Sequence, residues 1–149
     1  MRYISPMRLA FVFALIAATP LNAWEFSATP ICILTHATQE ITVRVTYDPR
    51  VPEYVIALTR IAAAWPDAPV FTLQFDGPRG LAISTSRHRL SDGGTTLTVT
   101  DTGFGNVLDG LELNDTATAL IGAAQVAIPL SDAATAVRAF RACTDASLA

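Results

Sequence analysis

The sequence predicts an α+β domain that is mainly antiparallel β, arranged as a small sandwich or a partly closed barrel, with one C-terminal helix. Two observations predict this class. Short runs with an apolar residue at every second position recur between turn residues up to position 130, as in half-buried antiparallel strands. From Ser131 the apolar spacing changes to three and four, which indicates a helix. Strands followed by one helix favour a single α+β domain.

Residues 1–23 have the pattern of a secretory signal peptide. Two arginines precede the apolar run from Leu9 to Ala18, and a small residue, Ala23, stands at the expected cut. The run is too short to span a bilayer, so we expect no stable membrane insertion after the signal is removed. The expected product is a mature domain of residues 24–149 that is periplasmic or secreted, in a bacterial host.

The charge of the mature domain argues against nucleic acid as a partner. The whole chain has a formal net charge of −3, and removal of the two arginines of the signal takes the mature domain to −5. All basic residues are arginine, and the chain has no lysine. Because sequence-independent nucleic-acid binding depends on neutralising phosphates, we expect no nucleic-acid binding.

Cys32 and Cys143 are the two cysteines of the chain, and they lie near opposite ends of the mature domain. In an exported protein such a pair is expected to form a disulfide bond. A reactive thiol is the alternative, but neither cysteine has a Cys-x-x-Cys spacing or a basic neighbour that would lower its pKa.

Three strands are predicted in the first half of the mature domain. Residues 41–48 and 54–60 alternate between apolar and polar positions and are rich in β-branched and aromatic residues. Prolines at positions 66 and 69 prevent a helix in the segment that follows. Residues 71–75 alternate again and predict the third strand.

A β-hairpin is predicted at the centre of the chain. The alternating runs Leu81 to Arg87 and Thr95 to Asp101 flank Asp92-Gly93-Gly94. Asp-Gly and Gly-Gly supply the positive φ angles of tight hairpin turns. The two runs are therefore expected to pair with each other as antiparallel strands.

Two short apolar runs and a helix complete the chain. Residues 119–121 and 126–130 are candidate strands on either side of Gly122. The helix is expected to start with Ser131 as its N-cap and to leave residues 144–149 as a loose tail. Its apolar face would hold Ala133, Ala136, Val137, Phe140 and Cys143, so that the disulfide holds the helix over the sheet.

Asp101-Thr102-Gly103 resembles the catalytic loop of aspartic proteases, in which an Asp-Thr-Gly follows a strand. In such an enzyme two aspartates share a proton, so this chain would have to dimerise across the site. The pattern departs from that family, because Thr100 replaces an apolar residue and Phe104-Gly105 replaces a small residue followed by Ser or Thr. The other interpretation is a glycine-rich turn in which Asp101 accepts backbone hydrogen bonds.

Arg87, His88 and Arg89 form a second candidate site. On a strand, the two arginines would point to one face and His88 to the other. They could bind a small anion together with Arg79, or they could form a solvated strand end. His88 as a hydrolase base is not favoured, since the chain lacks a Gly-x-Ser-x-Gly motif.

Neither a metal nor a cofactor is expected. His36 is the one further histidine, and it cannot complete a metal site once the cysteines are paired. Aromatic residues such as Phe104 could line a groove, or they could belong to the core.

The predicted binding surface is the end of the central hairpin with the loop that follows it, residues 87–89 and 101–106, where glycines at 103, 105 and 110 leave backbone amides open. We expect a non-catalytic periplasmic binding or accessory module that takes an unknown protein or a small anionic ligand. The alternatives are a small dimeric aspartic-type hydrolase that uses Asp101, and a structural component of a cell-envelope complex. The predicted binding residues are Arg87, His88, Arg89, Asp101, Phe104 and Asn106.

A set of short segments spread over the mature chain carries a resemblance to known proteins. The segments are Trp24-x-Phe26, Pro30 to Cys32, Thr46 to Pro49, Arg87 to Arg89, Gly103 to Leu111 and Phe140 to Cys143. With them, the whole mature chain resembles a group of small exported proteins from Rhodobacter-type alphaproteobacteria. Its ending, an apolar strand and then a helix that reaches a final cysteine, is also loosely similar to the invasion-associated locus B proteins. The resemblance implies a periplasmic setting and no particular mechanism.

Overall fold

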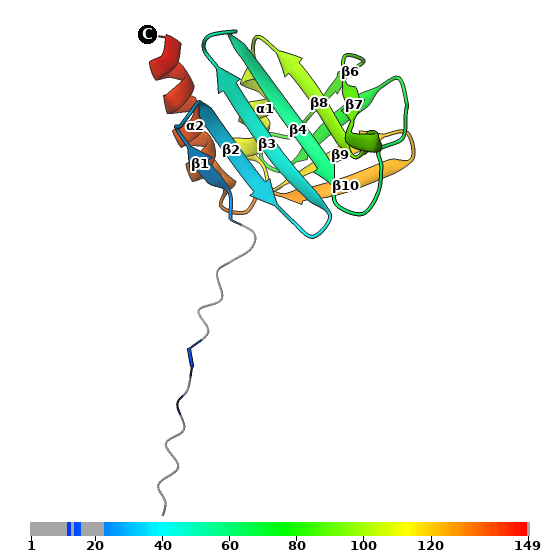
Figure 1. Cartoon of the computed structure of the whole chain (residues 1–149), viewed down its shortest axis with the longest axis horizontal. Helices are drawn as coiled ribbons and strands as arrows, with labels where there is room; N and C mark the ends of the chain where they lie inside the picture. The colour runs from blue at the N-terminus through cyan, green and yellow to red at the C-terminus, as the bar shows by residue number, and fades with distance from the viewer. Residues whose placement is uncertain (1–11, 13, 16–22, 149) are drawn as a thin grey trace, which may run out of the picture.

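The structure is a computed structural model that describes residues 12, 14, 15 and 23–148 (Figure 1). Most of the predicted signal peptide lies outside the described residues. Among the residues that are described, no helix is both long enough and apolar enough to cross a membrane.

Two antiparallel sheets face each other and enclose one core, as the predicted α+β class requires (Figure 1). The six-stranded sheet has the order β1-β2-β3-β4-β8-β7, and the four-stranded sheet has the order β10-β9-β5-β6. Neither sheet closes on itself, so the sandwich prediction holds and the barrel alternative does not. The strands are β1 (Glu25–Ser27), β2 (Cys32–Ala37), β3 (Ile41–Asp48), β4 (Glu53–Arg60), β5 (Phe71–Asp76), β6 (Leu81–Thr85), β7 (Arg89–Ser91), β8 (Thr96–Asp101), β9 (Thr116–Ile121) and β10 (Ala124–Pro129).

Alternation along the strands sets which side chains enter the core. In β3, Val43, Val45 and Tyr47 are buried, while Thr42 and Arg44 on the other face are exposed. The predicted strands at 41–48, 54–60 and 71–75 are confirmed, and the two candidates around Gly122 are β9 and β10. Their short turn needs the left-handed conformation of Gly122, with φ of +54°.

The glycine turn at the centre of the chain forms, but its first strand is short. Gly93 and Gly94 have φ angles of +68° and +86°, as the hairpin prediction requires. The strand that enters this turn is β7, in which Leu90 lies opposite Leu97 of β8.

The prediction that residues 81–87 pair with residues 95–101 is wrong. β6 pairs with β5 in the four-stranded sheet, with Ile83 opposite Leu73, whereas β8 pairs with β4 and β7 in the other sheet. A strand with alternating apolar residues can pair with any neighbouring strand that has an apolar face, so alternation alone does not identify its partner in the sheet. The chain therefore crosses from one sheet to the other between Thr85 and Arg89.

The helix α1 (Gly105–Leu113) was not predicted. It packs against β6 and β9 of the four-stranded sheet with Leu108 and Leu111 buried, while Asn106, Asp109 and Leu113 on its other side are exposed. Gly110 faces the ring of Phe75 so closely that any side chain there would overlap it. At its C-terminal end the buried Asn114 side chain donates a hydrogen bond of 3.1 Å to the Gly110 carbonyl, which satisfies one of the free carbonyls of the last turn.

The helix α2 (Ala133–Leu148) covers the β1–β2 edge of the larger sheet and packs against α1 (Figure 1). The predicted disulfide is confirmed: Cys32 of β2 is bonded to Cys143 of α2, with 6.0 Å between their Cα atoms. Arg141 of α2 forms ion pairs with Asp109 and Glu112 of α1. The two helices and the edge of the sheet are thus joined to one another.

Two predictions about this helix are wrong. It begins at Ala133, directly after Asp132, whose φ is +61°, so Ser131 does not occupy the N-cap position. Residues 144–148 are helical rather than a loose tail. Thr144, just past the disulfide, is 2% exposed, and its Oγ1 hydroxyl donates a hydrogen bond to the Arg141 carbonyl.

Candidate binding cleft

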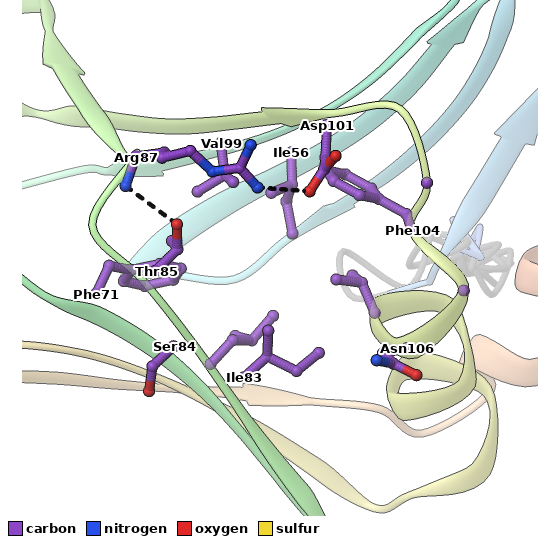
Figure 2. A pocket seen from close by; sticks show the side chains of 14 residues that line it. Ile56, Phe71, Ile83, Ser84, Thr85, Arg87, Val99, Asp101, Phe104 and Asn106 are labelled. Atoms are coloured by element: carbon purple, nitrogen blue, oxygen red, sulfur yellow. Dashed lines mark hydrogen bonds and ion pairs between the residues drawn. The ribbon is translucent and has the colours of Figure 1, made fainter.

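A cleft of about 420 Å³ opens between the two sheets on the side where β6 and β8 lie (Figure 2). The start of α1 closes one end of it, and the crossing from β6 to β7 bounds the other. Most of its wall is apolar, and a few polar groups stand among the apolar side chains. The apolar side chains are Ile56, Phe71, Leu73, Ile83, Val99, Phe104 and Val107.

The cleft follows from the strand order. β6 is the outermost strand of its sheet, so the inward side chain of Ile83 has no further strand beside it and is only partly buried. Val99 of β8 is also partly buried, on the opposite sheet, because β7 pairs with β8 only at residues 96–98 and stops short of it. The apolar positions of two strands that do not pair with each other thus form the two walls.

An ion pair between Arg87 and Asp101 spans the rim of the cleft (Figure 2). The Arg87 Nη2 atom donates to Asp101 Oδ2 at 2.8 Å, and the Thr102 amide donates to Asp101 Oδ1 at 2.7 Å. The hydrogen bond from the Thr102 amide, with a smaller contribution from Arg87, lowers the pKa of Asp101 below its usual range. Asp101 is therefore an ionised carboxylate at neutral pH.

This environment does not favour an aspartic-type reaction at Asp101. Two aspartates that share a proton need one carboxyl group with a raised pKa. The amide of Thr102 and the guanidinium of Arg87 both stabilise the charged form of Asp101 instead. The geometry matches the other interpretation of the Asp-Thr-Gly sequence, in which the aspartate accepts a backbone hydrogen bond at the end of a strand.

His88 and Arg89 do not line this cleft. The Nε2 atom of His88 lies 2.9 Å from the Ala68 carbonyl oxygen, and its ring packs near Phe71 with 6.3 Å between the ring centres. Arg89 lies on β7 with an exposed side chain. Together with Arg87 these residues border a separate shallow hollow.

Phe104 and Asn106 contribute to the cleft in different ways. Phe104 is 4% exposed and stacks on Tyr54 of β4 with 5.3 Å between ring centres, so it is part of the core as well as the wall. Asn106 is exposed in the first turn of α1, at the edge of the cleft (Figure 2). No side chain caps the first turn of α1, and Gly103 and Gly105 border the cleft there.

Of the six predicted binding residues, the structure brings four to one cleft, namely Arg87, Asp101, Phe104 and Asn106. The strand residues of the walls, such as Ile56, Ile83 and Val99, are not among the predicted binding residues. Their alternation marked them as inward-facing, but it gave no sign that two of them would border an opening.

Within residues 23–148, no three His, Cys, Asp or Glu side chains gather in a way that could hold a metal ion. Comparison of the chain with protein-family models, curated proteins and solved structures finds no match. The function therefore has to be argued from the cleft itself.

The lowered pKa of Asp101 leads to a prediction about its titration. Because the Thr102 amide is the larger cause, Arg87→Gln is expected to leave the pKa of Asp101 below that of the same residue in the urea-unfolded chain. The folded-state pKa is below the unfolded one, so the contacts of the Asp101 carboxylate, chiefly that with the Thr102 amide, stabilise the fold above pH about 4, and this contribution is lost as the pH falls through the lowered pKa. Carboxyl-carbon NMR of the wild type and the variant measures both values. A return of the Asp101 titration to its unfolded position in the variant would assign the whole shift to Arg87 and contradict the prediction.

Proposed function

We propose that this chain is a non-catalytic periplasmic binding module that holds a small amphipathic anion in the cleft between its sheets. One observation carries the proposal: a cleft of about 420 Å³ has apolar walls and an arginine at its mouth. Binding sites for small molecules have volumes of roughly 300 to 1,000 Å³, mostly apolar walls and a few placed polar groups. The cleft has these properties.

The two parts of the cleft fit the two parts of such a ligand. An apolar body would displace water from Ile83, Val99 and Val107, which are only partly buried in the free protein. The head group would lie at the rim near Arg87, whose side chain is 68% exposed. A guanidinium has five N–H donors, so Arg87 can bind an anion and keep its contact with Asp101.

The disulfide supports the proposed location. Cys32 and Cys143 are both in the bridge, and such bridges persist in oxidising compartments such as the bacterial periplasm. The signal-peptide pattern of residues 1–23 and the resemblance to exported alphaproteobacterial proteins are predictions that agree with this location.

Straight-chain carboxylates test the proposal. The protein is titrated with hexanoate, octanoate and decanoate, and binding is measured by calorimetry. The dissociation constant is expected to fall roughly fourfold per methylene until the cleft is full, since each buried methylene contributes about 0.8 kcal/mol. Ile83→Trp fills the cleft and should weaken binding at least about tenfold, or about 1.4 kcal/mol. Ala82→Trp is the matched control, because Ala82 precedes Ile83 on β6, is exposed and does not line the cleft.

The role of Arg87 is tested with the matching neutral ligand. Arg87→Gln should weaken the binding of octanoate and leave the binding of octanol unchanged, because only the carboxylate uses the guanidinium. Equal weakening by Ile83→Trp and Ala82→Trp, or no binding of any member of the series, would refute the cleft as the ligand site.

A further inference from the structure

A second feature, remote from the cleft, concerns a buried histidine at the start of the domain. His36 lies on β2 and is 5% exposed. Its ring stacks on the indole of Trp24, with 4.5 Å between ring centres and 6° between planes. Neither ring nitrogen of His36 has a hydrogen-bond partner of good geometry among the described residues, although the Ala23 backbone lies within reach of the ring. A buried polar group without a partner is costly, so the site lacks something that the folded protein should supply.

His36 borders a groove at the surface, so a group that lies in this groove can reach the ring. Ala23, Glu40 and Asp132 border the same groove, so two carboxylate side chains surround its opening. β3 and β4 lie between β2 and β8, so this groove is separate from the binding cleft. The carboxylates and the imidazole together would attract a group that is positively charged and donates hydrogen bonds.

We infer that the group is the α-ammonium of this chain's own mature N-terminus, which hydrolysis of the Ala23–Trp24 bond creates beside His36. Hydrolysis consumes one water, leaves a carboxylate on Ala23 that departs with the signal, and leaves the ammonium on Trp24. One N–H of that ammonium donates to a ring nitrogen of His36. The inference uses the predicted cut but does not depend on the proposed function of the cleft.

The position of Trp24 places its nitrogen in the right region. That nitrogen is bonded to the carbonyl carbon of Ala23, whose backbone is close enough to act as a hydrogen-bond partner of the His36 ring and to raise its pKa. Burial has the larger effect and lowers the pKa of His36, so the imidazole is neutral at pH 7 and has a free acceptor nitrogen.

Trp24 is also held firmly in place. Its indole is buried and its Nε1 atom donates to the Pro129 carbonyl oxygen at 3.2 Å. The next residues form β1, which pairs with β2 from Glu25 to Ser27. The new ammonium therefore cannot move far from His36 without the loss of these contacts.

The absence of lysine makes a direct test possible. After cleavage, the α-amine of Trp24 is the only primary amine of the mature chain, since every other basic side chain is arginine or histidine. The protein is exported with its own signal, its mass is measured intact, and it is treated with acetic anhydride at neutral pH. The stable mass increase then reports on this one amine.

The inference predicts a mature mass that starts at Trp24 and slow acetylation in the folded protein. Acetylation of the folded protein should be about tenfold slower than acetylation in urea, because an ammonium that donates to His36 loses its proton less readily. His36→Phe should acetylate at nearly the unfolded rate, whereas His36→Gln, which keeps an acceptor, should retain protection. His88→Phe is the matched control and should acetylate like the wild type. His88 directly precedes β7, which lies at the opposite end of the six-stranded sheet from β1.

Three results would overturn the inference. The first is a mature chain that starts at another residue. The second is equal acetylation of the folded and urea-unfolded wild type, which needs no variant and holds even if His36→Phe fails to fold. The third is a folded His36→Phe protein that is protected as well as the wild type.

Discussion

Replacement of both Cys32 and Cys143 by alanine is expected to lower the free energy of unfolding by about 4 to 5 kcal/mol. The bridge joins residues 111 positions apart, and closing a loop of this length removes about that much conformational freedom from the unfolded chain. Globular domains have total stabilities of about 5 to 15 kcal/mol, so the loss is a large share of the whole. Alanine is preferred to serine because Cys32 is buried, and serine would add a buried hydroxyl.

Urea unfolding of the variant and of the wild type measures this loss. Wild type with a phosphine reductant is the matched control, because it removes the bridge without a change of side chain. The slope of the free energy against urea should be steeper without the bridge, since the unfolded chain then exposes more surface. A loss below about 1 kcal/mol in both samples would show that the contacts of α2 hold the helix without the bridge, contrary to the chain-entropy argument.

The disulfide was predictable because it depends on few facts, namely two cysteines and an export pattern. The strands were predictable in place but not in partner. Residues 81–85 alternate, yet they were assigned to the wrong neighbour, because the preceding Asp76-Gly77-Pro78 turn and the later glycine turn both invite a hairpin. The chain uses the first turn for β5–β6 and the second for β7–β8.

The helix α1 was missed for a reason that lies in its own residues. Gly110, inside the helix, weakens it by about 1 kcal/mol relative to alanine, and no side chain caps its start at Gly105. Gly110 is present because the ring of Phe75 leaves no room for a side chain. Packing against Phe75 thus explains why Gly110, a residue that disfavours helices, lies inside α1 and why the sequence did not predict this helix. The cleft could not be predicted either, because it lies between two sheets whose strand order does not follow from the sequence pattern.

Phe104→Ala is expected to lower the free energy of unfolding by about 3 to 5 kcal/mol, the cost of removing a large buried aromatic side chain. Phe104 is 4% exposed and packs on Tyr54, which in turn packs on Tyr47 and Phe140. This cluster joins β3, β4, α2 and the start of α1. Removal of the ring therefore leaves a cavity among four elements, and the substitution is measured by urea unfolding as above.

The same substitution separates two roles that the sequence could not distinguish for Phe104, as a groove aromatic or as a core residue. If Phe104 belongs both to the core and to the cleft wall, Phe104→Ala should lower the free energy of unfolding and Phe104→Leu should lower it less. The enlarged cleft of the variants should also bind a longer carboxylate than the wild type does. A loss below about 1 kcal/mol for alanine would mean that the ring lies in solvent and contacts a partner only on binding. The stability of the two variants, compared with the longest carboxylate that each one binds, therefore tests the position of Phe104 and the position of the ligand in one experiment.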